Sequence, residues 1–460
     1  MRTFYWVRND FRVNDNTALF NAAKQAKNGI IAVFFITTEL WRKRGYGQNK
    51  IKFILNTVNI YSEDLLKLNI PLLIRYARNE KEVADRLIKI ARQYQCNALF
   101  YNRSYELKKI SLEEKVTRDF ANINLPVFSF DDEAILPPGS VRTKEDKYYS
   151  IFSPFKKQWI NEFKNMYFKV LPAPKKQKKL VAVEGKVKNF EIKASKILSL
   201  WPTGEDEAKK RLRIFIEKRV RQYNTNREFP AINGTSTLSP YLAIGAISPR
   251  QCLQAAIKAN NNKLNKGNKG ILTWINELIW RDFYKHLMWG FQYICTNQSF
   301  KAYGKKIQWS NDKKLFNAWK NGKTGFPIID AAMRQLLQMG WMHNRLRMVT
   351  ASFLTKLLLI DWRWGEKYFA ENLIDYDFSS NNGGWQWAAS TGADSMPYFR
   401  VFNPILQSQK YDPNGDFIRQ YCPEYQMVNS KDIHLPKEKA ILEYKTAKEK
   451  AIKIFKNATI

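Results

Sequence analysis

Apolar and polar residues follow two different rhythms along the first 130 positions. Short, mainly apolar runs fall at residues 3–7, 30–36, 71–75, 98–101 and 127–130. Amphipathic stretches at helical spacing, such as residues 49–68 and 80–94, lie between them. Strands that alternate with helices in this way are typical of a parallel sheet covered by helices. The pattern therefore predicts an α/β domain over residues 1–130.

The regular alternation ends after residue 130. A Pro-Pro-Gly turn at 137–139 and a lysine-rich run at 175–179 are typical of a connection, so we expect a long linker over residues 131–202. From residue 203 the pattern is almost entirely helical, which predicts an all-α domain over residues 203–460. Its clearest helices are expected near residues 204–221, 248–260, 270–289, 327–340 and 341–359.

The chain is strongly basic, with 76 Lys+Arg against 42 Asp+Glu and a formal net charge of +34. Such a charge attracts polyanions, so nucleic acid is the first partner to consider. The chain is also rich in Lys, Asn and Ile, a bias that an AT-rich genome produces without any selected function. Charge alone therefore leaves DNA binding open.

The remaining composition excludes several classes of protein. Hydrophobic residues make up 45% of the chain, which is enough for a large core and excludes disorder as the main state. The 4 Cys lie far apart without a CxxC pair and there are only 3 His, which argues against a disulfide scaffold and a metal site. No apolar run approaches the roughly 20 residues that span a bilayer, and no secretory segment is visible. We expect a cytoplasmic protein with no metal and no membrane contact.

One predicted helix carries an unusual polar stripe. Glu277, Trp280, Arg281 and Tyr284 recur at the spacing of a single helix face, whereas the apolar residues of 271–279 form another face. A carboxylate, an indole, a cation and a phenol are poor core material, but they suit a cleft that stacks a nucleobase and holds its polar edge. An ordinary surface helix with a Glu277–Arg281 pair is the alternative.

Aspartates and tryptophans cluster between residues 375 and 387. Asp375 and Asp377 flank Tyr376; they could bind a metal, but no His or Cys is near in sequence, and they could equally balance a buried arginine. On a helix, Trp385 and Trp387 would point about 200° apart. One is then expected inside and the other at a cleft, although core and rim positions would explain both.

Two further segments carry candidate chemistry. The hydroxyl-rich loop 235–239 precedes a helix, where hydroxyls and backbone N–H groups can hold phosphates, although this is also a common helix entry. In the helix predicted over 341–359, Asn344, Arg347 and Met348 share one face. Helix capping by Asn344 and a structural ion pair of Arg347 are the alternatives.

Together these segments resemble the photolyase/cryptochrome family, and most closely the bacterial class I cyclobutane pyrimidine dimer photolyases. The resemblance covers nearly the whole chain: it starts at residues 7–12, strengthens through 234–253, 274–284 and 322–362, and peaks at 381–391. It implies a Rossmann-like parallel-sheet antenna domain, a linker and an all-helical FAD-binding catalytic domain. It also implies light-dependent repair of UV-damaged DNA by a deoxyribodipyrimidine photolyase. Excited FADH⁻ would donate an electron to a dimer flipped out of the duplex, and the electron would return.

For the flavin, the resemblance implies that Arg347 pairs with Asp375, which gives each buried charge a partner. It also implies that Asn381 faces flavin N5, where a neutral amide hydrogen-bonds without adding charge. The residues expected to hold FAD are Tyr223, Thr235, Ser236, Thr237, Leu238, Ser239, Arg347, Asp375, Tyr376, Asp377 and Asn381.

For the DNA, the resemblance implies that Trp280 and Trp387 pack on the flipped dimer and that Glu277 and Asn344 hydrogen-bond its edges. The expected catalytic residues are Glu277, Asn344 and a chain of three tryptophans that reduces oxidised flavin under light, Trp385, Trp362 and Trp309. The residues expected to contact DNA are Arg227, Glu277, Trp280, Arg281, Tyr284, Asn344, Arg345, Met348, Trp387 and Gln407.

The antenna site departs from the family pattern. Folate-binding relatives carry an Asn-Glu pair where this chain has Lys108 and Lys109, and the histidine expected near Arg44 is missing. The expected antenna is still 5,10-methenyltetrahydrofolate, at a poorly matched site.

Three features favour the cyclobutane dimer over neighbouring activities. Six-four photolyases have histidines where this chain has Asn344 and Met348. Animal cryptochromes carry Cys and plant ones Asp at the position of Asn381, and the DASH type lacks one or both dimer-packing tryptophans. We expect a monomeric enzyme; the alternative is a cryptochrome-like blue-light photoreceptor or DNA-binding flavoprotein.

Overall fold

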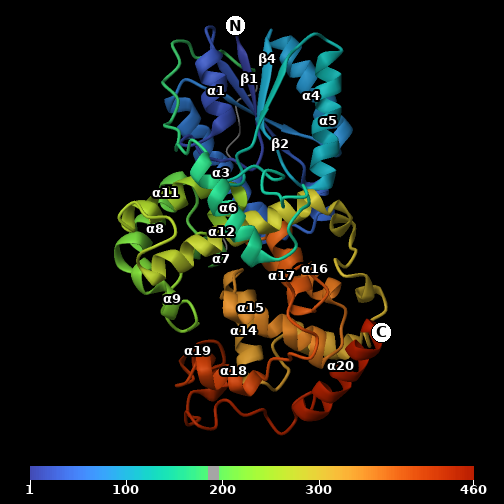
Figure 1. Cartoon of the computed structure of the whole chain (residues 1–460). Helices are drawn as coiled ribbons and strands as arrows, with labels where there is room; N and C mark the ends of the chain where they lie inside the picture. Colours follow the sequence, from blue (N-terminus) through green and yellow to red (C-terminus); the bar gives the residue numbers. More distant parts are fainter. Residues whose placement is uncertain (185–195) are drawn as a thin grey trace. The chain divides into compact units, whose positions relative to one another are not determined.

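The computed structural model describes residues 1–184 and 196–460. The chain forms two compact units. The first, here called the sheet unit, comprises Met1–Tyr149, Ser153–Val220 and Ser236–Gln292. The second, here called the helical unit, comprises Ser150–Phe152, Arg221–Thr235 and Tyr293–Ile460. Figure 1 shows the elements of both.

The sheet unit is built on a five-stranded, fully parallel sheet with strand order β3-β2-β1-β4-β5. Thr3 pairs with Ile30 on one side of β1 and with Ala98 on the other. This is the order of the first five strands of a Rossmann-like sheet, so the predicted fold class of this part is confirmed. The strands are β1 (Thr3–Val7), β2 (Ile30–Ile36), β3 (Leu72–Tyr76), β4 (Ala98–Asn102) and β5 (Val127–Phe130).

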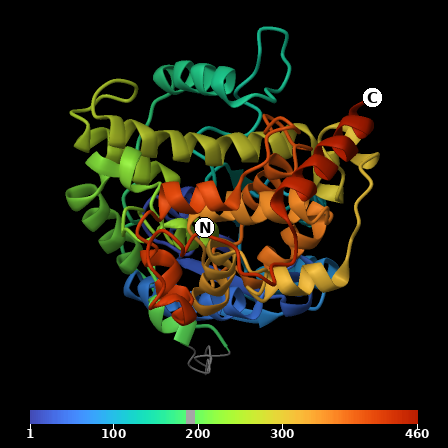
Figure 2. The ribbon, with the colours of Figure 1, turned by 90° about the horizontal axis from the view of Figure 1, so that it is seen from below.

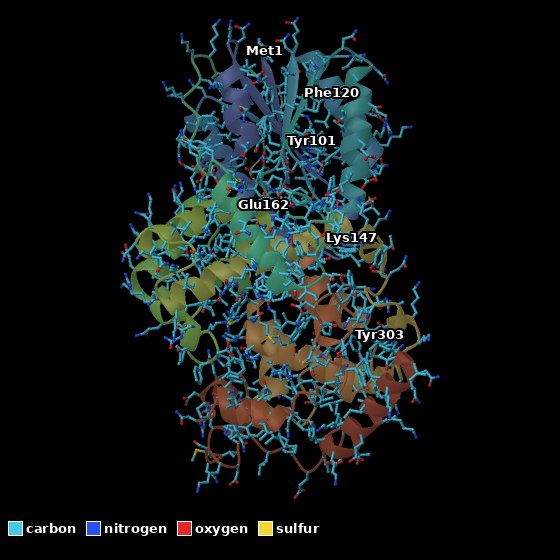
Figure 3. The ribbon with its side chains drawn as sticks, in the orientation of Figure 1. Met1, Tyr101, Phe120, Lys147, Glu162 and Tyr303 are labelled. Carbon is cyan, nitrogen blue, oxygen red and sulfur yellow. The ribbon has the colours of Figure 1, made fainter. Side chains whose placement is uncertain are left out.

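Helices cover both faces of the sheet (Figure 1). Alternate strand residues, such as Phe4 and Trp6, form one core with α4 and α5, and α1 lies on the other face. Tyr101 of β4 and Phe120 of α5 belong to the first core (Figure 3). The covering helices are α1 (Thr17–Gln25), α2 (Thr38–Lys43), α3 (Gln48–Lys67), α4 (Glu80–Gln93) and α5 (Leu107–Ala121).

A buried ion-pair network ties later helices to the sheet. Arg250 pairs with Asp15 at 2.9 Å and with Asp132 at 2.6 Å, and Arg12 also pairs with Asp132. Burial alone would raise the pKa of Asp132, but the two arginines hold it well below its ordinary value. The remaining α-helices described in this unit are α6 (Phe152–Asn165), α7 (Lys196–Leu200), α8 (Glu205–Lys218), α10 (Ser239–Ile244), α11 (Pro249–Ala259) and α12 (Lys269–Gly290). The first residue of α6, Phe152, belongs to the helical unit.

The compact units divide the chain differently from the three predicted segments, and the predicted borders at residues 130 and 202 stay a prediction. The segment expected to be a linker contains α6.

Among its described residues the helical unit contains helices and no strands. The prediction of a helix over 341–359 is wrong at its start, because α15 begins at Asn344. The side chain of His343 caps the helix by accepting a hydrogen bond from Arg345 N at 3.2 Å. The same helix passes into a π-helix, η4. The α-helices are α9 (Tyr223–Asn226), α13 (Lys313–Lys320), α14 (Pro327–Met339), α15 (Asn344–Ser352), α16 (Trp362–Asn372), α17 (Phe378–Ala388), α18 (Pro404–Tyr411), α19 (Asp416–Tyr421) and α20 (Tyr444–Thr459), with η4 at Phe353–Leu357 and a 3-10 helix, η3, at Ala302–Lys305.

The chain ends in α20, which packs against η4 and η3 of the same unit (Figures 1 and 2). No helix in residues 1–184 or 196–460 is long and apolar enough to cross a membrane.

Candidate functional site

An ion pair with a buried carboxylate joins α15 to the segment before α17. Arg347 Nη2 donates to Asp375 Oδ2 at 2.7 Å, and Arg347 Nε donates to the carbonyl of Met342 at 2.8 Å. The pairing predicted for Arg347 and Asp375 is therefore present. The Asp375 side chain is only 2% exposed, and its Oδ1 atom is buried with no hydrogen-bond partner. Buried carboxylate oxygens are nearly always hydrogen-bonded, so this atom marks a place for the donor of a ligand.

The start of α17 is fixed by Asp377, whose side chain accepts from Ser380 N at 3.0 Å. One turn later, Asn381 Nδ2 donates to the backbone carbonyl of Glu366 at 3.0 Å. The amide of Asn381 is thus oriented by α16, and its side-chain oxygen is left for another donor. Tyr376, between the two aspartates, is buried.

An open space lies beside α17. A Cβ atom built at Gly384 would meet nothing within 4 Å, although the neighbouring Trp385 and Gln386 are buried. In contrast, a Cβ at Gly365 of α16 would lie 2.1 Å from Trp385 Cη2. The surface of α17 at Gly384 can therefore accept a ligand, whereas α16 and α17 are closely packed at Gly365.

Glu366 is a functional candidate that the sequence reasoning missed. Burial raises its pKa to about 7, although a hydrogen bond from Asn382 and the charge of Arg363 lower it. Its signal in the sequence was a carboxylate on the apolar stripe of α16, where Trp362, Gly365 and Phe369 are buried. The backbone carbonyl of Glu366 accepts from Asn381 and its carboxylate accepts from Asn382 at 3.3 Å. A buried carboxyl group with a raised pKa beside a predicted site residue is a functional candidate.

The three tryptophans predicted to form a chain lie in the helical unit: Trp362 on α16, Trp385 on the adjacent α17, and Trp309 in the segment before α13. Trp385 is buried, and its ring packs on that of Phe369 with a centroid distance of 4.9 Å. It also lies against Gly365 of α16, which is one helical turn after Trp362. Trp362 is fully buried, and its Nε1 atom has no hydrogen-bond partner. Trp309 is half-buried and precedes Ser310, whose N–H donates to the carbonyl of Leu359 at 2.7 Å.

The helical unit also holds four of the predicted DNA contacts together. Arg345 forms an ion pair with Glu228, which lies 3.6 Å from Arg227. Asn344 is exposed at the start of α15, and its Nδ2 atom lies 3.9 Å from Met348 Sδ. Trp387 is half-buried while Trp385 is buried, as expected for helix residues that point apart.

The polar stripe of α12 lies in the sheet unit. Glu277, Trp280, Arg281 and Tyr284 are all partly exposed, whereas the predicted apolar face is buried. The rings of Trp280 and Tyr284 lie 5.7 Å apart. Arg281 donates to the backbone carbonyl of Glu133, so it is anchored to the loop that follows β5.

The predicted phosphate-binding loop spans the border of the two units: Tyr223 and Thr235 belong to the helical unit and residues 236–239 to the sheet unit. Thr237 has a positive φ of 52°, and its hydroxyl accepts from Arg211 at 3.1 Å. The backbone N–H of Leu238 donates to Ser236 Oγ at 3.4 Å, and Ser239 begins α10.

Gln407, another of the predicted DNA contacts, lies on α18 of the helical unit.

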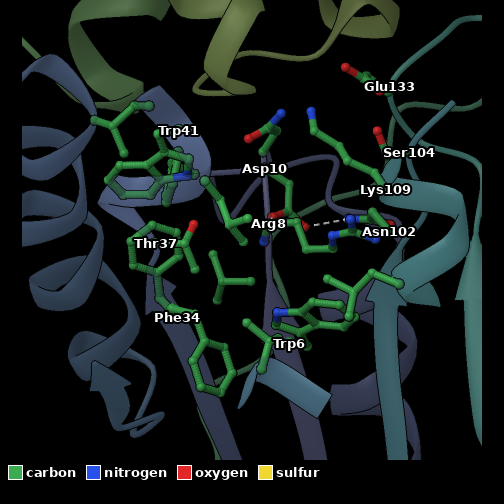
Figure 4. Close-up of a pocket in the computed structure, with 18 of the residues that line it drawn as sticks. Trp6, Arg8, Asp10, Phe34, Thr37, Trp41, Asn102, Ser104, Lys109 and Glu133 are labelled. Carbon is green, nitrogen blue, oxygen red and sulfur yellow. Dashed lines mark hydrogen bonds between the residues drawn. The ribbon is translucent and has the colours of Figure 1, made fainter. Parts of the chain in front are cut away.

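A pocket opens at the carboxyl ends of β1, β2 and β4 in the sheet unit (Figure 4). In open parallel sheets, ligands bind at these ends where the strand order reverses, here beside β1 and β4. Rings of Trp6, Phe34 and Trp41 line it together with Thr37 and Asn102. Its cations are held by acids: Arg44 lies 2.8 Å from Glu80, and Lys109 lies 2.7 Å from Glu106. The pocket brings together Arg44 and Lys109, two of the residues at the expected antenna site. The side chain of Lys108 lies outside the described part of the structure.

Two family models match the chain. Residues 3–176 match the model of DNA photolyase, and residues 274–458 match the FAD binding domain of DNA photolyase. The chain belongs to the DNA photolyase family. The second match contains Arg347, Asp375, Asn381 and Gly384.

Relatives named deoxyribodipyrimidine photo-lyase cover almost the whole chain. The one from Vibrio cholerae is 40% identical over 437 residues, which are 94% of this chain and 92% of the relative. The one from Escherichia coli is 40% identical over 438 residues, which are 94% of this chain and 91% of the relative. The family and enzyme class predicted from the sequence motifs are confirmed.

Solved photolyase-family structures share the fold. A class III photolyase from Agrobacterium tumefaciens has a TM-score of 0.88 at 29% identity and covers 100% of this chain and 98% of its own. A Synechocystis cryptochrome has a TM-score of 0.87 at 26% identity, with 99% of each chain covered. An archaeal photolyase from Sulfolobus tokodaii, described with two FAD molecules, has a TM-score of 0.83 at 28% identity and covers 99% of this chain and 100% of its own.

Proposed function

We propose that this chain is a deoxyribodipyrimidine photolyase that splits cyclobutane pyrimidine dimers in UV-damaged DNA. The observation that carries the proposal is the buried Asp375 oxygen without a donor, inside a segment that matches a photolyase FAD-binding domain. When bound and reduced, FAD supplies the light-driven electron that opens the dimer. The chain's own residues bind the cofactor, orient it and extrude the dimer.

The cofactor is held by residues 203–460 in this proposal. Asp375 Oδ1 would accept a hydrogen bond from the flavin, and the hydrogen bond from Arg347 to Asp375 Oδ2 holds the carboxylate in place. Asn381, whose amide nitrogen donates to the backbone carbonyl of Glu366, would offer an uncharged amide to flavin N5. Further contacts come from Tyr223, Thr235, Ser236, Thr237, Leu238, Ser239, Tyr376 and Asp377.

The damaged DNA is held by aromatic stacking and by cations. Trp280 and Trp387 pack on the extruded dimer, while Glu277 and Asn344 hydrogen-bond its polar edges. Arg227, Arg281, Arg345 and Gln407 contact the flanking backbone, with Tyr284 and Met348 beside them. Trp385, Trp362 and Trp309 would supply the electrons that reduce the cofactor when it is bound in its oxidised form.

The pocket at the carboxyl ends of β1, β2 and β4 is our proposed antenna site in residues 1–130. Its aromatic lining and its cations suit a flat, anionic chromophore. Folate is the expected chromophore from the sequence, and a second flavin is the alternative because the Sulfolobus relative is described with two FAD molecules. Mass spectrometry of the chromophores released from purified protein separates the two.

A photoreceptor role is the second candidate, since the Synechocystis cryptochrome has the same fold. The two functions differ in repair. FAD-loaded, reduced protein is illuminated with oligonucleotides that carry either a cyclobutane dimer or a six-four photoproduct. The proposal predicts loss of the cyclobutane dimer alone. A protein that binds one FAD and repairs neither lesion would instead be a photoreceptor.

A further inference from the structure

Glu228 lies between two arginines of the helical unit that we place on the DNA backbone. Its carboxylate pairs with Arg345, and the second oxygen lies 3.6 Å from Arg227 Nε. The Arg345, Arg227 and Glu228 side chains are 17%, 18% and 28% exposed. A phosphate from solution can therefore reach this group, but it meets a carboxylate there.

Arg345 is oriented from several sides. Its guanidinium carbon lies 4.4 Å from the centroid of the Tyr411 ring, and its backbone N–H donates to His343 Nδ1 at 3.2 Å. Its Nε atom is buried and has no hydrogen-bond partner, and the same is true of Gln407 Oε1, one turn before Tyr411. A guanidinium that is held in one orientation and is partly exposed is suited to bidentate binding of phosphate.

The surroundings of Glu228 are strongly positive. Burial, followed by the charges of Arg345, Arg347 and Arg227, lowers the pKa of His343 to about 3, so this histidine adds no charge near neutral pH. Arg347 is already paired with Asp375. Glu228 is thus an acid shared by Arg345 and Arg227, and a phosphate that binds them competes with its carboxylate.

We propose that Glu228 is a specificity-determining residue that occupies Arg345 and Arg227 in the DNA-free protein and yields them to a phosphate beside an extruded dimer. The inference rests on the proposed DNA contacts. Asn344, which reads the extruded base, directly precedes Arg345 in α15. A phosphate next to that base therefore arrives at Arg345 at high effective concentration and displaces the carboxylate. A phosphate of undamaged DNA has no such anchor and competes poorly.

The test compares FAD-loaded wild type and Glu228→Gln for binding to labelled duplexes, one undamaged and one with a single thymine dimer, over a range of KCl concentrations. Glu228→Gln is expected to bind undamaged DNA about threefold to tenfold more tightly, because Arg345 and Arg227 lose a carboxylate that competes with phosphate. The salt slope should steepen by about 0.9 for each added phosphate contact. Affinity for the dimer should rise less than twofold, so discrimination falls.

Glu424→Gln is the matched control. Glu424 is also a partly exposed acid of the helical unit, paired with Arg334 at 2.8 Å, and its loss changes the net charge equally. It should leave both affinities unchanged. Equal effects of the two variants, or an equal rise on both duplexes with Glu228→Gln, would overturn the inference. Weaker binding of both duplexes together with a lower Tm would assign Glu228 a structural role and also overturn it.

Measurements of dimer repair distinguish a failure of this inference from a failure of the proposed function. At saturating dimer, reduced Glu228→Gln protein should repair at the wild-type rate, and a slower rate would contradict a role in discrimination. If wild-type protein repaired no dimer, the proposed function would fail. Binding to undamaged DNA would still decide whether Glu228 restrains the arginines.

Discussion

Gly384 and Gly365 lie in neighbouring helices, yet the structure predicts opposite results for the same change to alanine. A glycine in a helix costs about 0.5–1 kcal/mol relative to alanine. The new methyl group of Gly384→Ala meets no atom within 4 Å, so FAD-free protein should gain about that amount. At Gly365 the methyl would lie 2.1 Å from Trp385 and 2.7 Å from Leu354. Overpacking of this kind costs about 1–3 kcal/mol, so Gly365→Ala should lose stability.

The affinity for FAD tests whether the open space at Gly384 is part of the flavin site. If the cofactor lies against this face of α17, Gly384→Leu should fold but bind FAD at least tenfold more weakly, a loss of about 1.4 kcal/mol. Urea denaturation of FAD-free protein measures the stability changes, and titration with FAD, followed by its fluorescence, measures affinity. Wild-type affinity in Gly384→Leu would refute the assignment of this face to the flavin. Destabilisation of FAD-free protein by Gly384→Ala would refute the packing argument.

Three further predictions concern single side chains. Trp385→Phe should block photoreduction of oxidised flavin but leave repair by chemically reduced protein intact, as measured by absorbance and by dimer loss; failure of both would make Trp385 structural. Burial raises the pKa of Glu366 to about 7, so the folded protein keeps the carboxyl proton up to a higher pH than the unfolded chain does. The free energy of unfolding should therefore fall by roughly 3 kcal/mol as the pH rises from 4.5 to 7. Glu366→Gln should remove that fall in pH-dependent urea denaturation of FAD-free protein, and an unchanged slope would contradict a buried, protonated Glu366. Burial, then the charge of Lys301, lowers the pKa of Lys356 well below its ordinary value, so unfolding takes up a proton and stability should rise with pH up to about 10. Lys356→Met should be more stable than wild type at pH 7 and should lack this rise. The Lys356 ammonium lies 3.4 Å from the centroid of the Phe455 ring, and a less stable variant would show that this contact outweighs the cost of burying the charge.

The α/β part of the fold was predictable because its signals are local. Apolar runs predicted β1, β2 and β5 to the residue, β4 to within one residue at its end, and β3 to within one residue at both ends. The stripe of α12 was also correctly divided into a buried and a partly exposed face. In these cases the period of the pattern matches the period of the element.

Long-range contacts were not predictable from local patterns. Arg250 reaches Asp15 and Asp132, which lie more than a hundred residues earlier, and this network brings α11 into the sheet unit. No spacing rule connects such residues. The start of α15 was missed for a local reason: His343 caps the helix through a ring nitrogen, and histidine is not among the residues that usually signal an N-cap.

The residues of the candidate site also fall into those that the sequence predicted and those that only the folded structure reveals. Family motifs identified Arg347 and Asp375 as partners, and the structure contains their ion pair. Glu366 was passed over because a carboxylate on an apolar stripe has no meaning until burial is known. Glu228 was passed over because it is notable only for the two arginines that fold against it.

The central claim is tested most directly by following intact thymine bases chromatographically after reduced, FAD-loaded protein is mixed with dimer-bearing oligonucleotide. Blue light should restore the paired thymines over many turnovers with no net consumption of reductant, and a sample kept in the dark should restore none. Dimers that persist under light in protein shown to hold reduced FAD, or that disappear equally in the dark, would contradict the account.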